Sequence, residues 1–329
     1  MSPPERPLAL PRGVASPDGT LGFVRNRRGD IDALRLDSGT LLWRGGVAAE
    51  PVAATDREVI AVRPSPGRSN ALDLLVLSVA DAGRVARECR IELPEGVMAA
   101  SSDPRDFQSW VELEGGTLRL EWKARSRYRA GAPPPAAVAR AARVEVRGAA
   151  RCDIERGAVT TEPSPGAQAE DLPPSLPYRI RSVWSQSAWS YGAGVASLAL
   201  AGPTDGRKLV LELRAAAASA PRVIELLPGD AFDVHVTPEG RYVFARPSRH
   251  QGSSEWSVFA TATGGRVSSL PHQEGFQWPC VVGGRAYYLL TGPTVGTGLL
   301  LESADLQAAQ ALWRHDLGGP VPSPPSLAR

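Results

Sequence analysis

The sequence predicts an all-β fold, namely a β-propeller built from four-stranded blades. Short apolar runs alternate with turns rich in Gly, Pro and Asp, and the 33 Gly and 30 Pro are spread along all 329 residues. A similar unit returns about every 45 residues. Apolar runs with such punctuation are typical of strands joined by tight turns. We count six units, with seven as the alternative if the least regular stretch hides one.

The first unit, residues 14–44, shows the pattern in full. Its turns lie at 16–19, 25–30 and 37–39, and its apolar runs lie at 21–24, 31–36 and 41–43. Each run has the length of one strand, so the unit predicts an antiparallel meander. Later units are expected to begin near residues 51, 98, 179, 231 and 276.

A glycine recurs just before the last strand of several units. The residues are Gly39, Gly83, Gly157 and Gly265, and each is followed by one residue and then by Leu or Val. A tight turn needs one position with positive φ, which glycine adopts without a steric penalty. The repetition therefore predicts the same turn before the outer strand of each of these units.

Residues 123–176 interrupt the regular spacing. They are rich in Ala, Pro and Arg, with a short helix expected at 136–142 and a Pro-rich linker at 162–176. We interpret them as an insertion within the third blade of a single propeller domain, residues 1–329. The alternative is a chain of two domains with a boundary near residue 170.

Two units resemble the repeat of quinoprotein-type (PQQ-like) β-propellers, whose blade motif runs approximately Ala-x-Asp-x-x-Thr-Gly-x-x-x-Trp. The matching residues are Ala33, Ser38, Gly39 and Trp43 in the first unit, and Asp305 and Trp313 in the last. Arg35 and Ala309 depart from the motif. The resemblance implies that Trp43 and Trp313 pack between neighbouring blades. It does not imply the cofactor, because the adjacent Cys pair that caps PQQ in those enzymes is absent here.

The two ends of the chain are expected to meet. Residues 7–11 are similar to the outer strands that end at 91–94 and 224–228, and Pro320-Val321 follows Trp313 much as Pro51-Val52 follows Trp43. An open sheet edge is a liability in a ring of blades. We therefore predict that the two termini jointly complete one blade.

The net charge of +2 is too balanced to indicate nucleic-acid binding by the whole chain. Sorted by loop type, however, the charges separate onto two predicted faces. The loops between second and third strands hold Arg25, Arg27, Arg28, Arg63, Arg68, Arg125, Arg127, Arg129, Arg207, Lys208, Arg246, Arg249 and His250. The other turns hold Asp18, Asp37, Asp56, Asp81, Asp103, Asp106, Asp153, Glu155, Glu239 and Asp305. The alternative interpretation is that Asp serves the turns locally and that Arg is abundant throughout.

We expect the basic face to bind an acidic surface of a protein partner, with nucleic acid as the alternative. The candidate partner-binding residues are Arg25, Arg27, Arg28, Arg63, Arg68, Arg246, Arg249 and His250, together with Trp189 and Tyr191. The last two belong to an aromatic stretch, residues 184–191, which is either an interaction hot spot or blade packing.

No motif indicates a catalytic residue, a cofactor site or a metal site. The four His are far apart in the chain, and there is no nucleophile elbow and no phosphate-binding Gly pattern. Three cysteines without metal spacing indicate reduced thiols, and no apolar stretch indicates a leader or a membrane span, so a cytoplasmic location is expected. The sequence thus predicts a non-catalytic scaffold subunit of a larger bacterial assembly. The alternatives are an enzyme with its site at the central channel and a nucleic-acid-binding subunit.

Overall fold

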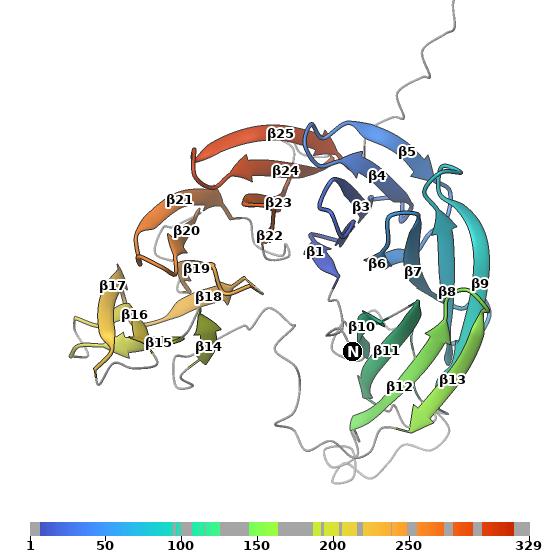
Figure 1. The fold of residues 1–329 in the computed structure, drawn as a ribbon, viewed down its shortest axis with the longest axis horizontal. Coiled ribbons are helices and arrows are strands. Elements are labelled where there is room, and N and C mark those ends of the chain that lie inside the picture. The colour runs from blue at the N-terminus through green and yellow to red at the C-terminus, as the bar shows by residue number, and fades with distance from the viewer. Residues whose placement is uncertain are drawn as a thin grey trace, which may run out of the picture. The chain divides into compact units, whose positions relative to one another are not determined.

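The structure is a computed structural model that describes residues 7–94, 97, 99, 107–114, 116–125, 145–163, 187–191, 194–203, 206–215, 220–237, 239–248, 255–272, 279–291 and 298–318. In these residues the regular structure is entirely β, with 25 strands in six antiparallel sheets (Figure 1). Each sheet is a meander of four strands in chain order, with a fifth strand in the first sheet. This is the blade pattern of a six-bladed β-propeller, so the predicted fold class is confirmed. The described residues include no helix long and apolar enough to cross a membrane.

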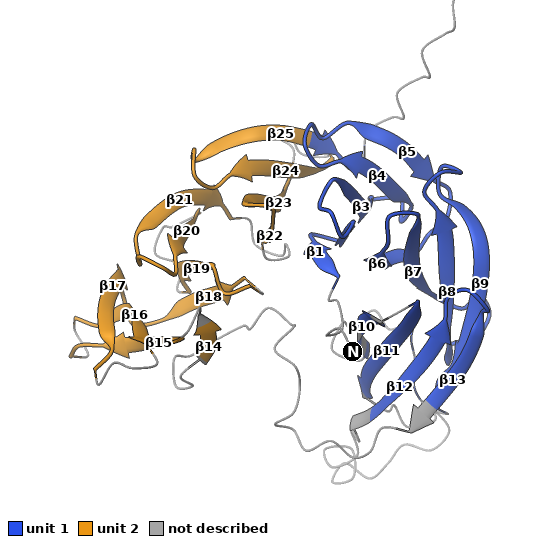
Figure 2. Ribbon diagram, in the orientation of Figure 1, with its two compact units in different colours: residues 1–171, 315–329 blue, residues 172–314 orange. Residues whose placement is uncertain are grey.

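The chain divides into two compact units (Figure 2). Unit 1 comprises residues 1–171 and 315–329 and holds the first three sheets. The first sheet consists of β1 (Leu8–Leu10), β2 (Gly13–Ala15), β3 (Leu21–Arg25), β4 (Ile31–Arg35) and β5 (Leu41–Gly45). The second consists of β6 (Glu50–Ala54), β7 (Glu58–Pro64), β8 (Ala71–Ser78) and β9 (Arg84–Glu92). The third consists of β10 (Phe107–Glu114), β11 (Thr117–Arg125), β12 (Glu145–Asp153) and β13 (Ala158–Pro163).

Unit 2 comprises residues 172–314 and holds the other three sheets, apart from the last two residues of β25. The fourth sheet consists of β14 (Ser187–Tyr191), β15 (Gly194–Ala201), β16 (Lys208–Ala215) and β17 (Arg222–Pro228). The fifth consists of β18 (Phe232–Val236), β19 (Tyr242–Pro247), β20 (Glu255–Ala260) and β21 (Arg266–Pro271). The sixth consists of β22 (Cys280–Val282), β23 (Arg285–Thr291), β24 (Leu299–Asp305) and β25 (Gln310–Asp316).

Strand β8 shows how the blades of unit 1 pack. Its first seven residues are buried, because the second sheet has a neighbour on each face. Leu75 and Leu77 pack into a cluster with Phe23 of the first sheet. Leu74 and Val76, which alternate with them along the strand, belong to a cluster with residues of the third sheet. Successive strand side chains point to opposite faces, so the apolar run from residue 74 to residue 77 is what a strand buried on both faces requires.

The recurring turn glycines have the predicted backbone conformation. Gly39, Gly83 and Gly157 have φ of 70°, 77° and 68°. In the fifth sheet the left-handed residue is Gly264, with φ 68°, rather than Gly265, because the amide of Gly264 closes the turn onto the carbonyl of Ala260 at 2.8 Å.

Three of these turns receive a side chain from the outer strand of the preceding sheet. A Cβ on the glycine would lie 2.4 Å from the ring of Trp43 at Gly83, 3.7 Å from Sγ of Cys89 at Gly157, and 2.6 Å from Ile224 at Gly264. Across their own sheets, these residues pair with a residue on the strand before the outer one: Trp43 with Ala33, Cys89 with Leu74, and Ile224 with Leu211. The turn glycines therefore admit side chains of the neighbouring blade, and Trp43 lies between two sheets, as the resemblance implies. Trp313 contacts Tyr287 of its own sheet, with ring centroids 5.9 Å apart.

In the described residues each sheet is built from one continuous stretch of chain, and Pro320-Val321, the C-terminal part of the predicted joint blade, lie outside them. The segment expected to act as an outer strand is β1, which folds back antiparallel onto β2. The tight turn between them includes Arg12, with φ 63°. The C-terminal end does reach the first sheet, because the carbonyl of Leu317 accepts a hydrogen bond from the amide of Arg27 at 3.1 Å.

The expected insertion is partly sheet. Residues 145–163 form β12 and β13, the two outer strands of the third sheet. The local signal for a strand is weak here because β12, with the sequence EVRGAARCD, has few β-branched or aromatic residues. Its pairing with β11 places Gly148 opposite Trp122, whose ring occupies the space of a Cβ at that glycine. The expected helix at 136–142 and most of the linker lie outside the described residues.

His235 makes the stability of unit 2 depend on pH. The side chain is 8% exposed, and burial lowers its pKa to about 4, although a hydrogen bond to the backbone of Pro279 opposes the shift. The unfolded chain takes up this proton near pH 6.5 and the folded chain only near pH 4, so stability falls as the pH falls through that window. We expect a loss of about 2 kcal/mol in the free energy of unfolding between pH 7 and pH 5.

Urea denaturation at both pH values, compared between the wild type and His235→Gln, measures this loss. The glutamine variant should lack that share of the pH dependence. An equal pH-dependent loss in both proteins would contradict the assignment to His235.

Candidate functional site

The loop between β3 and β4 is held by the buried side chain of Asn26. Its Oδ1 accepts hydrogen bonds from the amides of Arg28 at 2.9 Å and Asp30 at 3.1 Å. The backbone N–H of Asn26 donates to the backbone carbonyl of Asp30 at 2.8 Å, and the backbone carbonyl of Asn26 accepts from the N–H of Gly29 at 3.1 Å. Local side-chain bonds of this kind fix the backbone of a turn. The loop is therefore ordered by its own sequence, and the side chains of Arg27 and Arg28 are exposed on it.

Asp32 lies on β4, directly after this loop, and its carboxylate has no solvent exposure. It accepts two hydrogen bonds from Arg44, from Nε at 2.6 Å and Nη2 at 2.7 Å, and one from Nδ2 of Asn26 at 2.8 Å. Nε2 of His315 lies 3.2 Å from its Oδ2. A buried charge is stable only when paired and hydrogen-bonded. Asp32 thus connects the loop, the outer strand β5 and the C-terminal segment.

The surroundings of Asp32 keep it ionised. Burial acts to raise the pKa of Asp32, but the hydrogen bonds from His315, Arg44 and Asn26 outweigh it and leave the pKa below the usual value. A carboxyl with a lowered pKa stabilises the fold above the pKa of the unfolded chain. That stabilisation is lost as the pH falls through the lowered value.

The pairing of an arginine on the outer strand with an acid on the strand before it recurs. In the second sheet Asp73 is buried, faces Arg90 across the register and accepts a hydrogen bond from its Nε at 3.1 Å. Ser65, which follows β7 as Asn26 follows β3, donates to Asp73 at 2.8 Å. In the sixth sheet the buried acid is Glu302, which contacts Arg314 and the hydroxyl of Tyr288. The network at Asp32 is therefore a blade feature, and its structural role comes first.

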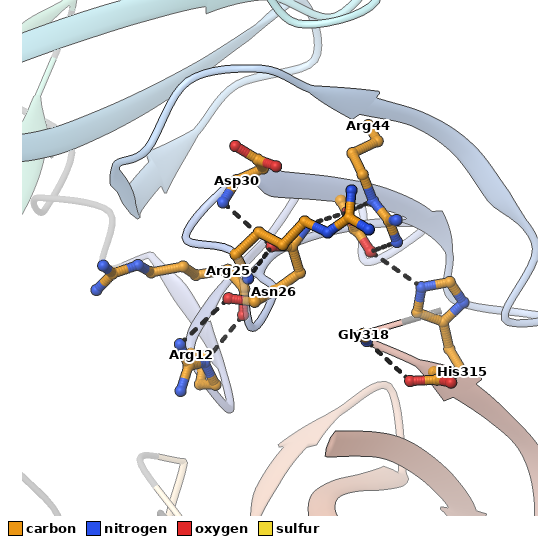
Figure 3. Close-up of polar contacts among 10 residues, drawn as sticks. Arg12, Arg25, Asn26, Asp30, Arg44, His315 and Gly318 are labelled. Carbon is orange, nitrogen blue, oxygen red and sulfur yellow. Dashed lines mark hydrogen bonds and ion pairs between the residues drawn. The ribbon is translucent and has the colours of Figure 1, made fainter. Parts of the chain in front are cut away.

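Four arginines gather at this end of the first sheet, and we call Arg12, Arg25, Arg27 and Arg28 the arginine cluster. Arg12 donates from Nε to the carbonyl of Arg25 at 2.9 Å and from Nη2 to that of Asn26 at 3.4 Å (Figure 3). Burial and the charge of Arg25 lower the pKa of Arg12, and Glu50 partly opposes this. The repulsion between Arg12 and Arg25 is the part of this effect that a bound anion would reduce. This arrangement can bind carboxylates or phosphates.

Sequence reasoning found three members of the arginine cluster and missed Arg12. Arg12 joins the cluster because it lies in the turn by which β1 folds back onto β2. The sequence of residues 7–15 does not show which strand β1 will pair with. Asn26 and Asp32 were missed as well, although a polar residue directly after an apolar strand was a usable signal.

Three of the other basic residues that we expected to bind a partner are paired within the protein. Arg63 lies 3.4 Å from Asp73 and 3.6 Å from Glu88, and Arg68 lies 2.9 Å from Glu92. In unit 2, Arg246 pairs with Asp233 at 2.6 Å, and its guanidinium lies 5.3 Å from the ring centroid of Trp256. Pairing with neighbouring acids leaves little net charge at these positions. The remaining members, Arg249 and His250, lie outside the described residues, as do Arg127, Arg129, Asp103 and Asp106.

Trp189 is half-buried between the fourth and fifth sheets. Its indole N–H donates to the carbonyl of Gly240 at 3.3 Å, and a Cβ on Gly240 would lie 2.7 Å from the ring. These contacts favour the packing interpretation of the aromatic stretch. Tyr191 ends β14, and its side chain lies outside the described part of the structure.

Several of the predicted acidic residues cap their own turns. Asp18 accepts hydrogen bonds from Ser16 and Thr20. Asp153 accepts from the amides of residues 155 and 156, and Asp305 from those of residues 307 and 308. Their carboxylates serve the local backbone, as Asp commonly does in turns.

In the described ranges, no three or more His, Cys, Asp or Glu side chains are grouped so that they could hold a metal ion. The comparisons with known proteins show no matching family model and no significant match to a curated protein sequence.

Three solved structures are similar to this chain at low sequence identity. Dihydro-heme d1 dehydrogenase NirN in complex with DHE is 14% identical, over 95% of this chain and 67% of that chain, with a TM-score of 0.35. Kluyveromyces lactis Hsv2 is 9% identical, over 94% and 100%, with a TM-score of 0.38. A variant of the AtxE2 isopeptidase with Astexin3-dC4 bound is 12% identical, over 98% and 52%, with a TM-score of 0.48. At these values the likeness assigns no function, so function is argued from the residues of this chain.

Proposed function

We propose that the protein is a non-catalytic interaction scaffold, and that the arginine cluster binds an acidic segment of a protein partner. The single observation that supports this most is the ordered loop at residues 26–30. Asn26 fixes its backbone, so the Cα positions from which Arg27 and Arg28 extend are set before a partner arrives. Preorganised charges lose less conformational entropy on binding and steer the encounter of opposite charges.

The surroundings favour a partner over an internal ion pair. Arg44 forms an ion pair with Asp32 inside the protein, so its charge is already neutralised. Arg27 and Arg28, in contrast, are exposed, so a partner can reach them. We place the scaffold within a larger bacterial assembly in the cytoplasm, for which the small number of cysteines and their lack of metal-ligand spacing give support. We also infer that its blades derive from a PQQ-like repeat in which Cys89 and Ile224 have replaced the Trp that the first sheet retains as Trp43.

The proposal is tested by charge reversal. We expect Arg27→Glu/Arg28→Glu to weaken binding of a fluorescent poly-glutamate peptide by at least about tenfold at low salt, because two attractive contacts become repulsive. Fluorescence anisotropy at two salt concentrations measures this change. The matched control is Arg57→Glu/Arg84→Glu, which makes the same change in net charge at two exposed positions of the second sheet, Arg57 in the turn between β6 and β7 and Arg84 at the start of β9.

Equal weakening in both double variants would contradict a local site and indicate an effect of net charge. Tighter binding of a single-stranded oligonucleotide than of the peptide would favour the nucleic-acid alternative. The same two variants, used as baits, should differ in the partner that co-purifies at stoichiometric levels with the wild type.

A further inference from the structure

Two cysteines that are far apart in the sequence meet in the core of unit 1. Cys89 lies on β9 of the second sheet and Cys152 on β12 of the third, 63 positions later. Their sulfur atoms are 3.2 Å apart. The residues are 4% and 1% exposed, within the apolar cluster that joins the two sheets.

The blade repeat explains why Cys89 reaches the next sheet. It occupies the place in the second sheet that Trp43 occupies in the first, opposite a residue on the strand before the outer one and directed at the next turn glycine, here Gly157. A small side chain in place of an indole leaves room beside that turn. Cys152 pairs with Val159 and Leu118 on the two neighbouring strands of its own sheet, and its thiol occupies this space.

We propose that Cys89 and Cys152 form a reversible disulfide that joins the second and third sheets under oxidising conditions. A disulfide has an S–S distance of about 2.05 Å, so each sulfur needs to move by only about half an ångström. Rotation about the Cα–Cβ bonds supplies such a shift without a change in the strands. Cys89 and Cys152 are the only side chains of the protein that take part in the reaction.

The oxidant is a small-molecule disulfide such as oxidised glutathione. One cysteine thiolate attacks a sulfur of the oxidant, the S–S bond of the oxidant breaks, and one molecule of its thiol leaves. The second cysteine thiolate then attacks the mixed disulfide and releases the second thiol. The protein loses two electrons and two protons, and the oxidant is reduced to two thiols that carry those protons.

Burial makes the reaction slow in the folded protein. It raises the pKa of Cys152 to about 12, with the neighbouring Cys89 adding to the effect, and only the thiolate is nucleophilic. The reaction therefore proceeds when the two sheets separate locally. Once formed, the bond closes a loop across 63 positions and restricts the unfolded chain. We expect it to raise the Tm of unit 1 by about 5–10 °C.

The experiment uses the full chain, incubated folded with oxidised glutathione, quenched in acid, denatured and titrated for thiols. The expected count falls from the three thiols of the sequence to one, with a mass lower by about 2 Da and a crosslinked peptide containing Cys89 and Cys152. Cys280→Ala, the matched control, should still form the crosslink. Cys89→Ala and Cys152→Ala should each lose it while retaining a β-sheet circular dichroism spectrum.

Three reactive thiols that persist at the most oxidising glutathione ratio would overturn the proposal. So would a stable glutathione adduct on Cys89 or Cys152, or a crosslink that includes Cys280. These readouts do not depend on partner binding, so the outcome is independent of the test of the scaffold function.

Discussion

Replacing Asp32 with alanine is expected to lower the free energy of unfolding of unit 1 by about 3–5 kcal/mol. The variant leaves the guanidinium of Arg44, whose side chain is 8% exposed, without its carboxylate. It also removes the acceptor for the side-chain amide of Asn26 and the contact with His315. An unpaired buried cation costs far more than the loss of one hydrogen bond, which is why this single change is so damaging.

Denaturant unfolding followed by circular dichroism measures the change. The matched control is Asp37→Ala in the same sheet, which breaks the ion pair with Arg35, whose partners are 58% and 56% exposed. An exposed pair contributes at most about 1 kcal/mol. A second variant, Asp32→Ala/Arg44→Met, should recover much of the loss, because it removes both charges. Equal losses for Asp32→Ala and Asp37→Ala would contradict a buried ionic network.

The fold was accessible from the sequence because its signals are local. Strand β8 is mostly apolar and bounded by turns, and the glycines at residues 39, 83 and 157 repeat before the outer strands of the first three sheets. Strand β12 was missed because its residues have no local preference for a strand. It is a strand because β11 pairs with it residue by residue from Thr117 to Arg125 and β13 pairs with its other edge.

The site was less accessible because it depends on contacts that are distant in sequence. Asp32 and His315 are 283 positions apart. Within the first sheet, a register shift between Ala33 and Leu34 means that strand spacing alone does not give the partners along β4 and β5. The Arg-rich loop was visible as composition, whereas the order that Asn26 imposes on it comes from hydrogen bonds. The same limit applies to Cys89 and Cys152, whose spacing in the chain gives no sign that the two thiols meet.

Replacing Gly83 with alanine is expected to lower the free energy of unfolding of unit 1 by about 3–4 kcal/mol. Two effects add at this position. The backbone has φ 77°, which an L-residue with a Cβ adopts only with strain. The new methyl group would also lie 2.4 Å from the ring of Trp43, so the indole would have to leave its place between the first and second sheets.

The chain offers a control that separates these effects. Gly67 has φ 75°, but a Cβ added there would have no heavy atom within 4 Å, so Gly67→Ala should show the backbone strain alone, about 1–2 kcal/mol. The difference between the two variants then measures the contact with Trp43. Adding Trp43→Leu to Gly83→Ala should cost less than the sum of the two single changes, because the smaller side chain removes the overlap. Equal losses at Gly83 and Gly67, or additive losses in the double variant, would show that this glycine does not make room for the tryptophan of the neighbouring blade.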